Sequence, residues 1–208
     1  MQINSDAVVW SSPERERAGR PLIVLLHGYG SHEGDLFGLS PRLPLGPVIA
    51  SLRAPLEESG GYAWFSLQNS ERGNPDPAAL DESATAVLDW LDTLEYTNVA
   101  LLGFSQGGAI ALQLNRLAPG RFAATVMLSG FVAGGEHAGD AELERLRPPV
   151  FWGRGTADQV ITDAAVARTE EWLPTHSTET TRIYEDLPHS ISSEELSNVS
   201  EFLREHLS

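Results

Sequence analysis

The pentapeptide Gly103-Phe104-Ser105-Gln106-Gly107 has the residue types and spacing of a turn that presents a nucleophilic serine. An apolar run that predicts a strand precedes it (99–102), and a helical pattern follows it. In such a strand–turn–helix, the serine sits on a strained backbone for which the flanking glycines make room. The start of the helix also favours negative charge and therefore an oxyanion. The pattern predicts acyl-transfer chemistry at Ser105.

A serine hydroxyl needs a base, and the base needs a carboxylate that fixes its tautomer. On a parallel sheet these partners are expected after the serine, in the order acid then histidine, each following a strand. His189 meets this condition because it follows a predicted strand at 181–184 and precedes the last helix. The other five histidines lie before the serine, in a glycine-rich loop, in a polar segment or within a helix (His27, His32, His137, His176 and His206). We predict His189 as the base.

Asp158 is the predicted acid because it follows the apolar run at 150–152. Three other aspartates fit less well. Asp163 falls in the first turn of the next predicted helix, where a carboxylate stabilises the helix dipole. Asp186 is too near His189 in sequence to approach from a different loop, and Asp140 follows no predicted strand.

Two backbone N–H groups are needed to hold a developing oxyanion. We predict that of Gln106 and, from the glycine-rich loop at 27–31, that of Tyr29. A metal site built on His27 with His32 and Glu33 is an alternative use of this loop. No further ligand is close by, so loop-bracing hydrogen bonds explain His27 more simply, and no metal or other cofactor is predicted.

Short apolar runs alternate with helical patterns along the chain, which predicts an α/β fold with helices flanking a mostly parallel sheet. The predicted strands are 7–10, 22–26, 48–52, 99–102, 125–128, 150–152 and 181–184. Four helices are predicted: one after the Asp76-Pro77 cap, one from Ser105 to Pro119, one from Thr162 to Leu173 where Pro174 ends it, and one after the Ser192-x-x-Glu195 capping box. The segment 54–77 fits neither period and contains Tyr62, Trp64 and Phe65, so it is predicted to be a long loop, either functional or merely covering the sheet edge.

Composition narrows the function classes. The 208 residues fit a single domain (1–208), with a net charge of −15, no cysteine and no lysine. A thiol nucleophile, a disulfide framework and a lysine Schiff base are therefore excluded. The acidic balance disfavours binding to nucleic acid and to anionic membrane surfaces. The apolar runs are too short to span a bilayer and the first residues do not resemble a signal peptide, so a cytoplasmic protein is expected, as a monomer or homodimer.

Seven segments, taken together and in this order, resemble the carboxylesterase/phospholipase/thioesterase family of small α/β-hydrolases. They are Leu25–Gly30, Leu52–Pro55, Tyr62–Phe65, Gly103–Gly108, Leu128–Gly130, Gly155–Asp158 and His189–Ser192. The resemblance covers nearly the whole chain and includes acyl-protein thioesterases and lysophospholipases.

The resemblance implies an α/β-hydrolase fold without a separate lid domain and a triad of Ser105, Asp158 and His189. It also implies that Trp64, Ser129 and Gly130 lie near an acyl pocket. Two positions depart from the family pattern. Pro188 stands where glycine is usual, and Tyr29 stands where leucine is common in acyl-protein thioesterases.

The expected activity is hydrolysis of carboxylic esters with short to medium acyl chains through an acyl-enzyme. An acyl-thioesterase or lysophospholipase with the same triad is an alternative, and a noncatalytic ligand-binding α/β-hydrolase remains a different class. The expected partner is a small-molecule ester or thioester.

Overall fold

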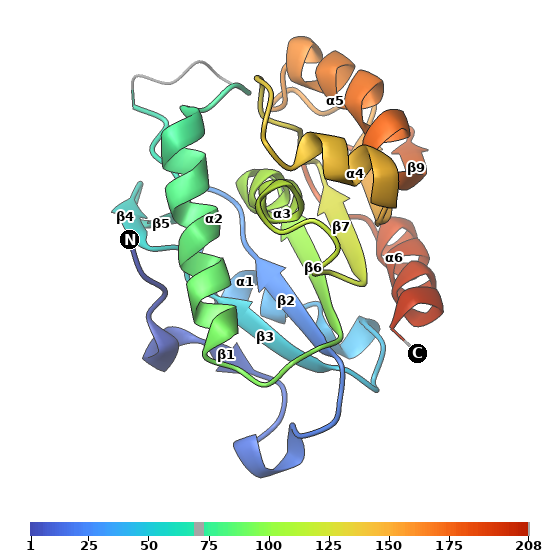
Figure 1. The fold of residues 1–208 in the computed structure, drawn as a ribbon. Coiled ribbons are helices and arrows are strands. Elements are labelled where there is room, and N and C mark those ends of the chain that lie inside the picture. Colours follow the sequence, from blue (N-terminus) through green and yellow to red (C-terminus); the bar gives the residue numbers. More distant parts are fainter. Residues whose placement is uncertain (69–72, 208) are drawn as a thin grey trace.

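The computed structural model of the chain describes residues 1–68 and 73–207. Its main sheet has seven strands in the order β1-β3-β2-β6-β7-β8-β9, and all neighbouring strands are parallel except β1 and β3. The strands are β1 (Val9–Trp10), β2 (Leu22–Leu26), β3 (Val48–Leu52), β6 (Val99–Phe104), β7 (Ala124–Leu128), β8 (Pro149–Gly155) and β9 (Thr178–Tyr184). The predicted α/β-hydrolase fold with a mostly parallel sheet is confirmed (Figure 1).

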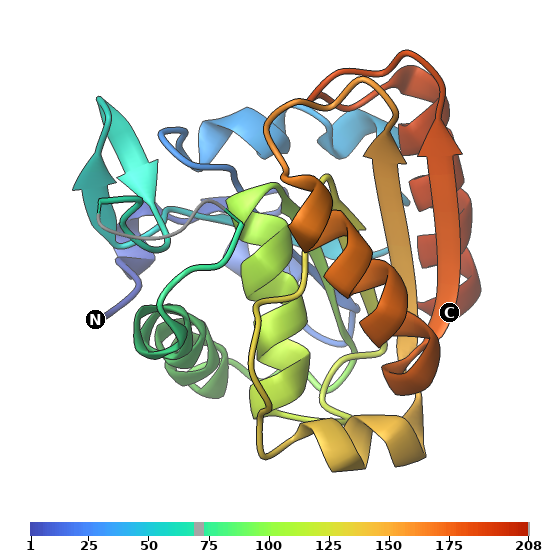
Figure 2. The same ribbon diagram turned by 90° about the horizontal axis from the view of Figure 1, so that it is seen from above.

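Helices cover both faces of this sheet (Figure 2). The helices α2 (Pro77–Asp92), α3 (Gln106–Leu117) and α5 (Asp163–His176) pack on one face, while α1 (Gly34–Phe37) and α6 (Ser193–His206) pack on the other. The short helix α4 (Asp140–Leu146) lies beside α5 (Figure 1). Of the helices in the described part of the chain, none combines the length and the apolar composition needed to cross a membrane.

The central strands are buried on both faces because their side chains alternate between two cores. Along β2, Leu22, Val24 and Leu26 pack against α2 and α3, whereas Ile23 and Leu25 pack toward α1 and α6. A strand with apolar residues at successive positions therefore satisfies both helical layers. Because both faces are buried, these strands could be predicted from short continuous apolar runs in the sequence.

Three helices begin with a side-chain cap, and two of these caps, at Asp76 and Ser192, were predicted. Asp76 caps α2 by accepting from Ala78 N–H, Thr162 caps α5 by accepting from Ala165 N–H, and Ser192 and Glu195 form the capping box of α6. The predicted end of α5 was wrong: the helix continues past Pro174 to His176. Proline lacks an N–H and normally interrupts a helix, but here it stands in the last turn, where Ser177 N–H still donates to Leu173 O.

Within the predicted loop at 54–77, residues 56–63 form a β-hairpin, and residues 69–72 lie outside the described part. The hairpin pairs β4 (Leu56–Glu58) with β5 (Gly61–Ala63) through a turn in which Ser59 and Gly60 have φ of 56° and 78°. Strands of three residues are too short to show a period of two. The first predicted strand, 7–10, was likewise too long, since residues 5–7 form a 3₁₀ turn before β1.

Candidate active site

Ser105 lies on a sharp turn between β6 and α3. Its backbone has φ 55° and ψ −117°, a conformation that a residue with a side chain adopts only under strain. The turn depends on its glycines: a Cβ on Gly103 would collide with Gly107 O, and one on Gly107 would collide with Leu26 O. These close backbone approaches place the Ser105 side chain at the N-terminus of α3, at the carboxyl edge of the sheet.

The structure brings Ser105, His189 and Asp158 into one hydrogen-bonded chain. His189 Nδ1 donates to Asp158 Oδ2 at 2.7 Å, and His189 Nε2 lies 2.9 Å from Ser105 Oγ. Because the carboxylate can only accept, it places the imidazole proton on Nδ1 and leaves Nε2 free to accept from the serine hydroxyl. This is the geometry of a nucleophile, a base and an orienting acid.

Asp158 is held as an anion. Burial opposes its ionisation, but hydrogen bonds from His189 and from the N–H groups of Val160 and Ile161 outweigh burial and keep the pKa of Asp158 below its ordinary value. The two amides donate to Oδ1 at 2.8 and 3.2 Å, which leaves Oδ2 for the histidine. The Asp158 side chain is 7% exposed and that of His189 is 17% exposed, so the pair is largely shielded from solvent.

The loops that carry the acid and the histidine are joined by backbone hydrogen bonds. Thr156 N–H donates to Tyr184 O, and Ala157 N–H donates to Leu187 O. A Cβ on Gly155 would collide with Leu187 O, so glycine is required for this approach. The link extends the pairing of β8 and β9 beyond the sheet and sets the separation of the two side chains.

The N–H groups of Tyr29 and Gln106 have no protein acceptor among the described residues. Gln106 is the first residue of α3, whose N–H has no partner within the helix. The loop containing Tyr29 lies against the serine turn, since a Cβ on Gly28 would lie 3.2 Å from Phe104 and 3.6 Å from Ser105 Cβ. Two unpaired donors beside the serine are what an oxyanion hole requires.

The His27 side chain stabilises the loop that contains Tyr29 through hydrogen bonds. Its Nδ1 lies 2.7 Å from Gly28 O and donates to it, while its Nε2 accepts from Ala54 N–H at 3.1 Å. Burial lowers the pKa of His27, which keeps the ring neutral. Both ring nitrogens are therefore occupied, in agreement with the bracing role and not with the metal alternative. Within residues 1–68 and 73–207, no group of three potential metal ligands is found.

The Gln106 side chain fastens the aromatic segment to the serine turn. Its Oε1 accepts from Trp64 N–H at 2.7 Å, and its Nε2 donates to Phe65 O at 2.6 Å. Trp64 is fully buried, and its Nε1 donates to His27 O. The structure thus places Trp64 beneath the oxyanion loop, outside the cavity described next, rather than in the expected acyl pocket. Its size and its indole N–H suit it to this supporting position.

A cavity of about 400 Å³ opens above Ser105 and His189. Most of its other lining residues are apolar: Phe65, Leu67, Pro75, Phe104, Phe131, Val160 and Ile161. The loops after β2, β7 and β8 contribute to it, as does the segment before α2. Among the described residues, the remaining lining residues are Tyr29, Gln106, Gly28, Gly73, Ser31 and Asp35.

Ser129 and Gly130 do not line this cavity. They line a smaller polar one of about 80 Å³, together with Arg154, Asp158 and other residues of the acid loop. Ser129 continues the backbone pairing of β7 by donating to Gly153 O, and it has φ 44°, so its side chain is carried behind the acid. Phe131, one position later, lines the larger cavity instead.

The sequence analysis did not single out four of the cavity residues: Asp35, Phe131, Val160 and Ile161. Each lies in an irregular segment just after a strand or in a short helix. Their positions after β2, β7 and β8 could have indicated that they lie near the site, because the parallel strands end at the same edge of the sheet as Ser105.

Comparison with known proteins agrees with this geometry. Residues 5–207 match the phospholipase/carboxylesterase family. Acyl-protein thioesterase 1 of Candida albicans is 27% identical, over 92% of this chain and 94% of its own length. Esterase YpfH of Escherichia coli is 26% identical, over 96% of this chain and 88% of its own.

Solved structures share the fold. The carboxylesterase of Bacillus cereus superposes with a TM-score of 0.79 at 20% identity, covering 96% of this chain and 93% of its own. Esterase PE8 also gives 0.79, at 24% identity and full coverage of both chains. The match over almost the entire length, on a sheet with a serine at the predicted turn, shows that the chain belongs to the phospholipase/carboxylesterase family of α/β-hydrolases.

Proposed function

We propose that residues 1–208 form one hydrolase domain that cleaves carboxylic esters of short to medium acyl chains. In this proposal His189 takes the Ser105 proton as Oγ attacks the ester carbonyl, and the Tyr29 and Gln106 N–H groups hold the oxyanion. The protonated His189 then gives its proton to the departing alcohol. Water hydrolyses the acyl-enzyme by the same steps, which returns Ser105 to its free form.

The observation that carries this proposal is the continuous chain from Ser105 through His189 to Asp158, with two free N–H groups beside the serine. Each such donor is worth roughly 2.7–4 kcal/mol of barrier in related chemistry. The cavity supports the substrate class. Its volume of about 400 Å³ lies toward the small end of the range for ligand sites, and its lining is largely apolar.

Substitution of Ser105 by alanine tests the reaction. Ser105→Ala is expected to abolish hydrolysis of p-nitrophenyl butyrate with no loss of folding, as judged by circular dichroism and thermal unfolding. Ser200→Ala is the matched control, because it also removes a buried hydroxyl but on α6, far from the serine turn in sequence. A folded Ser105→Ala enzyme that keeps its activity would refute the assignment.

The acyl group and leaving group need a separate test. A series of p-nitrophenyl esters from acetate to palmitate, with an acyl thioester of matched chain length, measures both preferences in kcat/KM. We expect an optimum at short or medium chains. An optimum at palmitate, or a strong preference for the thioester, would instead favour the second candidate, a thioesterase or lysophospholipase. The similarity to an acyl-protein thioesterase supports this second candidate.

A noncatalytic role is distinguished by the reactivity of Ser105. A fluorophosphonate probe labels a serine only when a neighbouring base activates it. Labelling of the wild-type protein and its loss in Ser105→Ala would support the enzyme, whereas an unreactive wild-type protein would favour a binding function. The proposal also includes the expected cytoplasmic location and a monomeric or dimeric state, which cell fractionation and sedimentation would test.

A further inference from the structure

The two sides of the cavity differ in chemistry. Ser105 follows β6, and in the sheet order β2 lies on one side of β6 while β7 and β8 lie on the other. The segments after β7 and β8 supply Phe131, Val160 and Ile161, which are apolar. The segment after β2 supplies Ser31 and Asp35. An ester that spans Ser105 therefore has an apolar side for its acyl chain and an acidic side for its alcohol.

Asp35 brings an uncompensated negative charge to this cavity. Its Oδ2 accepts from Ser31 Oγ at 2.6 Å, and the described residues offer no arginine or histidine within ion-pairing distance of it. The neighbouring acid, Glu33, differs because Arg53 pairs with it. Asp35 is exposed and lines the cavity, so its carboxylate is open to an incoming ligand.

Aromatic rings accompany this carboxylate. Phe65, Phe104 and Tyr29 line the same cavity, and Phe104 also packs against His189 with ring centroids 4.8 Å apart. Aromatic faces attract cations, most strongly when the cation is poorly hydrated as a quaternary ammonium group is. A carboxylate that shares a cavity with aromatic residues, and that pairs with no arginine or histidine among the described residues, is complementary to an organic ammonium ion.

We propose that Asp35 makes the alcohol side of the site selective for esters whose leaving group carries a positive charge. This inference rests on the proposed esterase function and names a substrate class for it. Asp35 acts here as a specificity residue, not as a member of the serine–histidine–aspartate chain. Anionic leaving groups, such as those ending in a carboxylate or phosphate, are expected to be rejected by the same charge.

Asp35 also has a structural role, which the test must separate. Through Ser31 it stabilises the loop that carries the Tyr29 N–H group, and it stands in the first turn of the short helix α1. Asp35→Asn removes the charge but keeps an oxygen that can accept from Ser31. A purely structural role predicts that this variant changes charged and neutral substrates alike. The specificity role predicts a change for the charged substrate alone.

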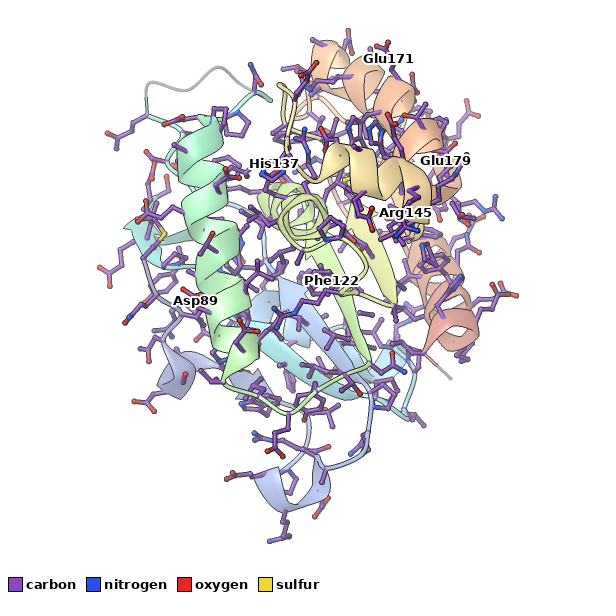
Figure 3. All side chains as sticks on the ribbon, in the orientation of Figure 1. Asp89, Phe122, His137, Arg145, Glu171 and Glu179 are labelled. Atoms are coloured by element: carbon purple, nitrogen blue, oxygen red, sulfur yellow. The ribbon has the colours of Figure 1, made fainter. Side chains whose placement is uncertain are left out.

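The experiment compares butyrylcholine with 3,3-dimethylbutyl butyrate, its neutral carbon analogue, in wild type, Asp35→Asn and Asp89→Asn. The ammonium group also activates the ester chemically, so the readout is the kcat/KM ratio of the two esters in each protein. Asp89→Asn is the matched control: it makes the same change in net charge on the exposed part of α2 (Figure 3), which separates a local contact from the field of the whole protein.

We expect Asp35→Asn to lower the charged-to-neutral ratio about tenfold, the effect of one well-placed charge interaction, while Asp89→Asn leaves it within about twofold of wild type. The difference should shrink as salt is added. An unchanged ratio in Asp35→Asn, or an equal fall in Asp89→Asn, would overturn the inference and leave the esterase proposal standing.

A binding measurement makes the two proposals separable. Saturation transfer from the protein to the N-methyl protons of choline, measured on wild type and Asp35→Asn, needs no turnover. If no ester is hydrolysed but choline binds wild type and not Asp35→Asn, the esterase proposal fails and the cation site survives. If choline binds both proteins equally or neither, the cation site is refuted.

Discussion

Replacing Glu195 by glutamine tests how the protein tolerates a carboxyl group buried where α6 begins. Glu195 is 1% exposed and lies against Gly153 of β8, so closely that a Cβ on that glycine would collide with Glu195 Oε1. Its Oε2 accepts from Ser192 N–H as part of the capping box, but Oε1 has no hydrogen-bond partner among the described residues. Burial without full hydrogen bonding raises the pKa of Glu195 to about 7.

The magnitude follows from the difference between the folded and unfolded pKa values. The pKa rises on folding from 4.5 to about 7, so the ionised carboxylate costs the folded state about 3 kcal/mol at high pH. Below pH 4.5 both states hold the proton and this cost is absent. Between pH 4.5 and about 7 only the folded state holds it, so the free energy of unfolding falls as the pH rises and stays low above pH 7. Roughly 2 kcal/mol of the change lies between about pH 5.5 and about pH 8.5.

Urea unfolding followed by tryptophan fluorescence measures this effect over that range, which avoids the pI near 4.7. Glu195→Gln keeps the shape of the capping residue but cannot ionise. The free energy of unfolding of this variant, minus that of wild type, is therefore expected to increase by about 2 kcal/mol from about pH 5.5 to about pH 8.5. Glu194→Gln is the control, because it removes the same charge from the exposed neighbour in the same helical turn. A stability difference between Glu195→Gln and wild type that does not change with pH would refute the reasoning.

Three further substitutions test the site. Asp158→Asn should lower kcat by about 10³–10⁴-fold at neutral pH, because an amide can donate to the imidazole and favour the wrong tautomer. Near-normal turnover of a p-nitrophenyl ester would mean that another group orients His189. Gln106→Ala keeps its backbone N–H but loses two buried hydrogen bonds to residues 64 and 65, so the free energy of unfolding measured in urea should fall by about 1–3 kcal/mol. An unchanged unfolding midpoint would show that these two hydrogen bonds do not stabilise the fold. Gly107→Ala should fail to accumulate as folded protein, since its Cβ would collide with Leu26 O, and a stable, active variant would contradict the packing of the serine turn.

Much of this protein could be predicted from its sequence because its strongest signals are local. The central strands are continuous apolar runs, since both of their faces are buried, and β2 and β3 were predicted to the residue. The caps at Asp76 and Ser192 could be predicted because each contact joins residues at most three positions apart. The prediction of Ser105, Asp158 and His189 used the rule that parallel strands end at one edge, which needs only the order of the elements.

What the sequence did not predict depends on contacts between distant segments. Trp64 was expected in the pocket because it is aromatic and stands in a long irregular segment, yet its indole and backbone are fixed by His27 and Gln106, far away along the chain. Ser129 was expected near the acyl pocket, but it lines the smaller polar cavity with Asp158.

The sequence by itself determined the fold class, the serine turn and the chain order of the three residues predicted to form the triad, because backbone geometry and hydrophobic burial are encoded within short windows. Only the tertiary structure decided the shape and charge of the cavity. Asp35, Phe131 and Ile161 come from three different segments, and they share one cavity because the sheet brings the ends of β2, β7 and β8 to the same edge. No local pattern records which side chains converge there, since that depends on strand order and on the path of each loop.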